Sequence, residues 1–83
     1  MTGAVLLPAA IPLTLPMGEL QILAFIYDSG YTLKTDSALA KIGNIPSTQV
    51  AGLIEKWERK GWVRVKRFQY MNGKVTRWII AAM

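Results

Sequence analysis

Basic side chains, which bind phosphate groups and other anions, crowd into one stretch of this sequence. Of the ten lysines and arginines, seven lie between Arg59 and Arg77, whereas residues 1–33 contain none. The two acids of residues 1–33 give that part a net charge of −2, and residues 34–83, with all ten bases and three acids, carry +7. Such an asymmetry is typical of a protein with a polyanionic partner, and the candidates are nucleic acid and an acidic membrane surface.

Other residue types that carry chemistry are scarce. The 83-residue chain has no histidine and no cysteine, which removes the commonest general base, the commonest metal ligand and thiolate chemistry. Its five acids are scattered without the spacing of a metal site, and no glycine-rich phosphate loop is present. We therefore expect neither an enzyme nor a metal site, a cofactor or a small-molecule ligand.

Residues 1–16 predict an apolar arm ahead of a single folded domain at residues 17–83. The arm is uncharged and holds three prolines, Pro8, Pro12 and Pro16, which interrupt helices. It is too short for a membrane-spanning helix and lacks the positive leading region of a secretory signal. Its apolar side chains should pack either on this domain or on a second copy, and we expect no membrane contact. The expected location is cytoplasmic and nucleoid-associated.

Apolar residues at helical spacing predict three helices in residues 17–60. The first begins at about residue 17 and ends near Ser29, because Gly30 is a good C-terminal stop. A short β-like link follows, and Thr35 or Asp36 caps a second helix that ends at residues 43–44.

The third helix is expected from Pro46 to Lys60. Its buried stripe recurs at i, i+3, i+4 and i+7, and consists of Val50, Leu53, Ile54 and Trp57. Gly52 lies on the opposite side and costs about 1 kcal/mol relative to alanine. Gly52 indicates one of two things. The helix either approaches DNA or another chain closely at this residue, or simply tolerates a less stable position.

The chain ends in a predicted β-hairpin whose turn is Asn72-Gly73. This pair favours a two-residue type I′ turn, in which both residues adopt positive φ. The resulting register places Ile80 opposite Val65 and Trp78 opposite Arg67. The face expected to pack on the helices holds Val63, Val65, Ile80 and Ala82. The other face holds Arg64, Lys66, Phe68, Tyr70, Val75, Arg77 and Ile79.

The aromatic residues of the hairpin have two interpretations. Phe68, Tyr70 and Trp78 either pack across the strands or form a stacking platform for single-stranded bases. In the expected register, Arg67 either makes a cation–π pair with Trp78 or contacts DNA.

Residues 36–63, DSALAKIGNIPSTQVAGLIEKWERKGWV, resemble the central part of winged helix-turn-helix regulators of the MarR type. The matching features are the small-residue helix at 38–40, the turn at 42–45, the Pro-Ser-Thr opening of the next helix and the run 58–63 that leads into the wing. The resemblance covers residues 20–82 and implies a mainly α fold with a wing of two or three strands. The long dimerising helices of that family are missing, so a homodimer would use residues 4–16 or the first helix.

The expected function is binding to double-stranded DNA, in transcriptional regulation or as a replication or recombination accessory factor. Residues 46–60 would serve as the recognition helix in the major groove, with Gln49 suited to adenine, while the wing would meet the backbone or the minor groove. The expected DNA-binding residues are Thr35, Pro46, Ser47, Thr48, Gln49, Lys56, Arg64, Lys66, Arg67, Lys74 and Arg77.

Two alternatives remain open at this stage. A winged helix can also serve as a protein–protein interaction module, and the apolar arm motivates that hypothesis. The aromatic face of the hairpin motivates the other, which is binding to single-stranded nucleic acid or RNA.

Overall fold

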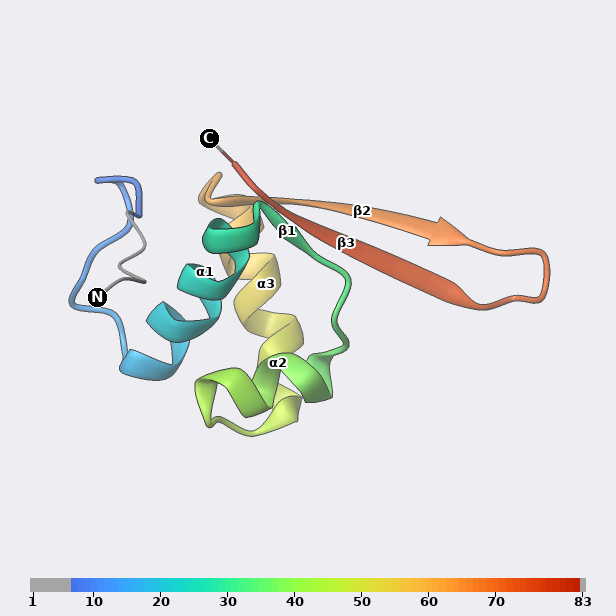
Figure 1. Ribbon diagram of the computed structural model, residues 1–83, viewed down its shortest axis with the longest axis horizontal. Coiled ribbons are helices and arrows are strands. Elements are labelled where there is room, and N and C mark those ends of the chain that lie inside the picture. Colours follow the sequence, from blue (N-terminus) through green and yellow to red (C-terminus); the bar gives the residue numbers. More distant parts are fainter. Residues whose placement is uncertain (1–6, 83) are drawn as a thin grey trace.

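The computed structural model describes residues 7–82, in which three α-helices pack beside a three-stranded antiparallel sheet (Figure 1). The helices are α1 (Met17–Ser29), α2 (Asp36–Gly43) and α3 (Val50–Arg59), and one turn of 3₁₀ helix, η1 (Ser47–Gln49), precedes α3. The strands are β1 (Tyr31–Thr32), β2 (Val63–Gln69) and β3 (Val75–Ala81), in the order β1-β3-β2. The expected set of elements, three helices followed by a hairpin, is present, and β1 adds a third strand.

The first two helices begin and end where their terminal residues predict. Gly30 ends α1 with a φ of 85°, a left-handed conformation that glycine adopts without steric cost. Thr35 caps α2, and its side-chain oxygen accepts a hydrogen bond from the Ala38 N–H at 3.2 Å. Asn44 closes the same helix at a φ of 54°. Gly30 and Thr35 thereby set the two ends of the link between α1 and α2.

The predicted helix from Pro46 to Lys60 is corrected at its N-terminus. The Gln49 N–H donates to the Pro46 carbonyl at 3.1 Å, and Val50 donates to the Ser47 carbonyl, so the first turn closes in the tighter 3₁₀ pattern. No side chain caps this turn, and a 3₁₀ turn is a usual way to satisfy backbone groups at an uncapped end. The α-helix itself begins at Val50 and buries the predicted stripe.

The hairpin has a three-residue loop instead of the expected two-residue type I′ turn. The Gly73 N–H donates to the Tyr70 carbonyl at 2.9 Å, and the Tyr70 N–H donates to the Lys74 carbonyl at 2.7 Å. Gly73 has a φ of 83°, whereas Asn72 has no positive φ. This geometry is that of a type I turn followed by a left-handed glycine. The Asn72 Oδ1 accepts the Lys74 N–H at 2.9 Å and stabilises the loop.

The extra loop residue shifts β3 by one position, so the predicted faces of this strand were wrong. Val65 pairs with Ile79, and Arg67 pairs with Arg77. A shift of one residue exchanges the two faces of a strand. Ile79 is therefore buried against the helices, while Trp78 lies on the outer face.

Part of the apolar N-terminal arm belongs to the core of this chain. The Ile11 side chain is buried in the same cluster as Ile22, Leu39 and Trp57, and Leu15 packs against that cluster. Of the two expected packing modes, the described residues therefore show packing on the same domain. Residues 4–6, which were also proposed for a homodimer contact, lie outside the described residues.

The hairpin projects beyond the helices (Figure 1). Near its base, Val63, Val65 and Ile79 face the helical layer. Further along the hairpin, the same face continues through Arg67 and Arg77, and Arg77 reaches Asp36 at the start of α2. This continuation forms one wall of the candidate site. Within residues 7–82, no helix has both the length and the apolar character needed to cross a membrane.

Candidate nucleic-acid interface

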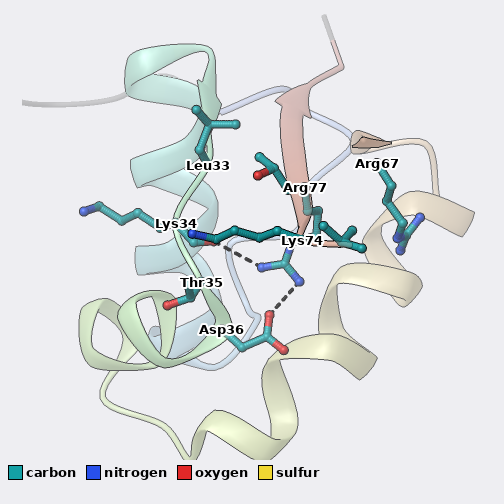
Figure 2. Close-up of a pocket in the computed structure, with 9 residues that line it drawn as sticks. Leu33, Lys34, Thr35, Asp36, Arg67, Lys74 and Arg77 are labelled. Atoms are coloured by element: carbon teal, nitrogen blue, oxygen red, sulfur yellow. Dashed lines mark hydrogen bonds and ion pairs between the residues drawn. The ribbon is translucent and has the colours of Figure 1, made fainter. Parts of the chain in front are cut away.

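A pocket of about 510 Å³ opens between the hairpin and the segment that leads into α2 (Figure 2). One wall comes from Leu33–Asp36 and the other from Arg67 and residues 74–77. Figure 2 shows the Lys74 side chain extended across the pocket, while the Lys34 ammonium group points away from it. That ammonium group lies 5.7 Å from the centre of the Phe25 ring. The pocket therefore presents three cationic groups and one carboxylate.

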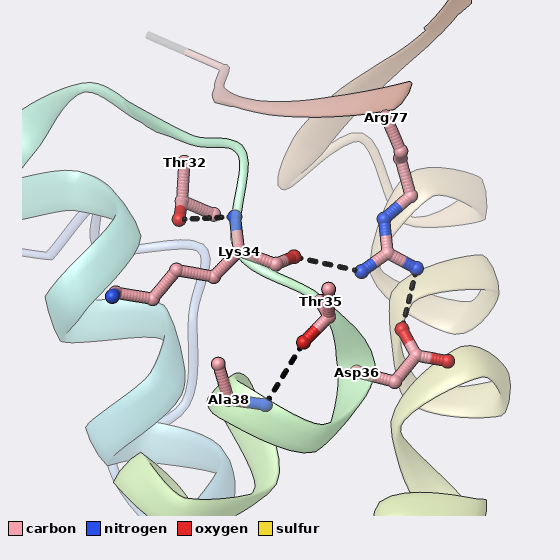
Figure 3. A network of polar contacts seen from close by, with 6 residues as sticks. All are labelled: Thr32, Lys34, Thr35, Asp36, Ala38 and Arg77. Atoms are coloured by element: carbon pink, nitrogen blue, oxygen red, sulfur yellow. Dashed lines mark hydrogen bonds and ion pairs between the residues drawn. The ribbon is translucent and has the colours of Figure 1, made fainter. Parts of the chain in front are cut away.

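Arg77 joins the two walls of this pocket through its guanidinium group. Its Nη1 lies 2.6 Å from the Asp36 Oδ1, and its Nη2 donates to the Lys34 carbonyl at 3.2 Å (Figure 3). The Thr32 hydroxyl accepts the Lys34 N–H and fixes the same link. The Arg77 side chain is 20% exposed, and this network holds it, whereas the sequence predicted a residue that contacts DNA.

Arg67 stands directly opposite Arg77 in the β2–β3 pair. Like charges in this position destabilise a sheet, and Asp36 offsets the charge of only one of them. Arg67 and Lys74 have no ion pair within residues 7–82. The pocket consequently has two unneutralised cationic side chains, whose charge favours the approach of an anion such as phosphate.

The polar opening of α3 lies on the surface beside α2. Pro46, Ser47, Thr48 and Gln49 are all exposed, and η1 is in contact with α2. Figure 1 shows the start of α2 and the yellow-green turn before α3 together at the lower right of the helical layer, on the side where the hairpin projects. The predicted base-contacting residues are thus accessible, and Thr35, the cap of α2, lines the pocket.

Lys56 is engaged by an acid on a neighbouring helix. Its Nζ lies 3.8 Å from the Glu19 Oε1, which ties α3 to α1. The Lys56 side chain is half-buried. This contact competes with the phosphate contact expected from the sequence.

Arg64 and Lys66 lie on the opposite face of the hairpin from the pocket. They alternate with Val63 and Val65 along β2, and both are exposed. A cation–π pair between Arg67 and Trp78 was one of two predicted roles of Arg67, and the register excludes it, because Lys66 is the residue that pairs with Trp78. The Trp78 ring instead contacts Tyr31 and Phe68. The predicted wing cations are therefore divided between two faces.

Sequence reasoning missed Asp36, Lys34 and Tyr31 as members of these surfaces. Asp36 was predicted only as a helix cap, and its contact with Arg77 joins residues far apart in the chain. Tyr31 belongs to the short strand β1, which pairs with β3. The alternation of side chains along that strand would have placed Tyr31 outward once the pairing was known.

The described residues contain no group of three or more acidic, histidine or cysteine side chains that would hold a metal ion. Searches of protein-family models, curated proteins and solved structures found no match to this chain.

Proposed function

We propose that this chain is a winged helix-turn-helix domain that binds double-stranded DNA. The proposal depends above all on the cationic pocket between the hairpin and the start of α2, which lies on the side where Ser47–Gln49 are exposed. In this arrangement, η1 and the first turn of α3 enter the major groove, while Arg67 and Lys74 contact phosphates or the edge of the minor groove. A role in transcriptional regulation, replication or recombination would use this interface.

The contacts have different roles in this proposal. Arg67 and Lys74 are uncompensated and supply most of the sequence-independent affinity. Arg77 chiefly positions the wing, because Asp36 and the Lys34 carbonyl already hold its guanidinium group. Gln49 and its exposed neighbours supply base contacts, for which a glutamine–adenine pair has suitable geometry.

Fluorescence anisotropy with a labelled duplex of about two helical turns tests the proposal. We expect binding at about 50 mM salt that weakens steeply by about 200 mM, because bound cations are released from the DNA. The double variant Arg67→Gln with Lys74→Gln should bind at least about tenfold more weakly and lower the salt slope by about 1.8. Absence of wild-type binding at the lower salt concentration would refute the proposal.

A matched control separates this site from general charge. Lys41 and Arg59 are also exposed cations, in the last turns of α2 and α3. The double variant Lys41→Gln with Arg59→Gln removes the same charge away from the pocket. Equal losses in the two double variants would show that the pocket has no special part in binding.

A protein-interaction role is the second candidate, favoured by exposed apolar side chains near the start of α1. Leu13 is 77% exposed and Met17 is 68% exposed. Deletion of residues 1–16 would be a poor test, because it also removes Ile11 from the core. Leu13→Ser with Met17→Ser leaves the core intact, and loss of a partner by this variant with unchanged DNA binding would identify the apolar surface as the interface.

A further inference from the structure

The outer face of the sheet carries a row of aromatic rings that the duplex proposal does not use. Tyr31 on β1, Trp78 on β3 and Phe68 on β2 contribute one ring each. These residues are 50%, 38% and 45% exposed, respectively. A contiguous exposed apolar patch of this kind is typical of an interaction site.

The three rings are arranged as a continuous surface. The Tyr31 and Trp78 rings are stacked, with 5.7 Å between centroids and 24° between planes. Phe68 meets Trp78 edge-on, also at 5.7 Å. The rings therefore stabilise one another across the strands, as one sequence hypothesis expected, and still leave aromatic surface open to a flat partner.

Two uncompensated cations flank this row. Arg64 and Lys66 lie on the same face of β2 as Phe68, because side chains alternate along a strand. Neither has an ion pair within residues 7–82, and all five acids of the chain lie outside the three strands. Two copies of this face would oppose cation to cation, which disfavours self-association. Its charge is complementary to a polyanion.

We infer that this outer face binds single-stranded nucleic acid. Unpaired bases stack on Trp78 and its neighbouring rings, while Arg64 and Lys66 contact the phosphates of the same strand. A duplex does not offer its base faces in this way, so we do not expect this surface to bind duplex DNA. The surface also lies on the opposite face of the hairpin from the pocket. The inference stands independently of duplex binding.

Intrinsic tryptophan fluorescence gives a direct test. Trp57 is fully buried and Trp62 is 8% exposed, so Trp78 is the tryptophan best placed to contact a stacked base. Titration with an oligothymidylate or oligouridylate of about twelve nucleotides should quench the fluorescence to saturation. Trp78→Phe should abolish most of the quenching while retaining part of the affinity for a labelled oligonucleotide.

Side-chain variants then distinguish stacking from charge. Phe68→Ala should lower the affinity for the oligonucleotide at least about fivefold. Lys66→Gln should lower it more than the control Lys41→Gln, which removes the same charge from α2. The pocket variant Arg67→Gln with Lys74→Gln should bind duplex DNA more weakly, as proposed above, and keep its fluorescence response to single strands. Circular dichroism and urea unfolding establish that each variant is folded.

Three outcomes would overturn the inference. Inorganic polyphosphate that competes as well as the oligonucleotide would show that charge alone is recognised. Binding to anionic phospholipid vesicles, with a blue shift of the tryptophan emission and no response to oligonucleotides, would assign the face to a membrane surface. A folded Phe68→Ala variant with wild-type affinity, or quenching that persists in a folded Trp78→Phe variant, would remove the rings from the binding site.

Discussion

Arg77 on β3 and Asp36 at the start of α2 form the ion pair that joins the β2–β3 hairpin to the helical layer, with 2.6 Å between Nη1 and Oδ1. The same guanidinium group receives a second anchor from the Lys34 carbonyl. Asp36 also relieves the repulsion between Arg77 and Arg67, which face each other across the strands. The position of the hairpin relative to α2 therefore depends on an acid within the cationic site.

Replacing Asp36 by asparagine should separate its two effects. The free energy of unfolding should fall by at most about 1 kcal/mol, because both side chains are partly exposed to water. Duplex affinity should rise, because the pocket loses its only carboxylate and Arg77 becomes available to phosphate. Urea unfolding and anisotropy measure the two quantities.

Arg77→Gln is the companion variant to Asp36→Asn. It breaks the same ion pair but removes positive charge, so it should lose a similar amount of stability and bind duplex DNA more weakly than the wild type. If Asp36→Asn also weakened duplex binding while remaining folded, the orientation of the wing would matter more than the charge of the pocket.

Tyr27→Phe should destabilise the fold without touching either proposed surface. The buried Tyr27 hydroxyl donates to the Trp62 carbonyl and lies 3.2 Å from the Ala82 carbonyl, so it joins α1 to the two ends of the hairpin. Removing the hydroxyl leaves buried carbonyl groups with fewer donors, which costs about 1–2 kcal/mol. Urea unfolding at neutral pH measures the loss. An unchanged free energy of unfolding would show that this hydrogen bond makes no net contribution to stability.

The same tyrosine predicts a loss of stability at high pH. Burial raises the pKa of Tyr27 above its ordinary value, which is about 10. Above that pH the unfolded chain releases this proton while the folded chain retains it, so the unfolded state is favoured as the pH rises. The difference in unfolding free energy between wild type and Tyr27→Phe should therefore be constant up to about pH 9 and shrink above about pH 10. A difference that grew with pH would contradict the direction of the shift.

Local signals predicted the helices well, because caps and periodicity depend on neighbouring residues. Gly30 and Thr35 act through their own backbone or side-chain geometry and need no tertiary contact. The buried stripe of α3 likewise follows from the spacing of Val50, Ile54 and Trp57. Such features can be recognised from a short window of sequence.

The hairpin register was not decided by its turn sequence. Asn-Gly is compatible with a two-residue loop and with a three-residue loop that ends in a left-handed glycine. The bond from the Lys74 N–H to Asn72 accompanies the second form here. The resulting shift by one residue exchanged Trp78 and Arg77 between faces, so the pocket and the position of Trp78 on the same face as Phe68 were beyond sequence reasoning.

Gly43→Ala should destabilise the packing of α2 on α1. A Cβ at Gly43 would lie 2.7 Å from the Gly18 carbonyl oxygen and 2.8 Å from the Ile22 Cδ1. The backbone oxygen cannot move aside as a flexible side chain can, and overpacking of this kind costs about 1–3 kcal/mol. Urea unfolding measures the effect. A midpoint of the variant equal to that of the wild type would show that α1 and α2 can move apart without loss of stability.

Gly52→Ala provides the opposite case and tests how closely α3 approaches DNA. Apart from the backbone of its own helix, no atom lies within 4 Å of the Cβ that would be added, and Gly52 is exposed in the first turn of α3. Alanine should therefore raise the free energy of unfolding by at most about 1 kcal/mol, because it favours the helix. Gly52 lies one turn after Gln49 on the side proposed to enter the major groove, so the new methyl group should also lower duplex affinity several-fold if the backbone approaches the DNA closely. Anisotropy and urea unfolding on the same variant separate the two effects. Higher stability with unchanged affinity would show that this turn of α3 stays clear of the duplex, and base readout would then be confined to the exposed residues of η1.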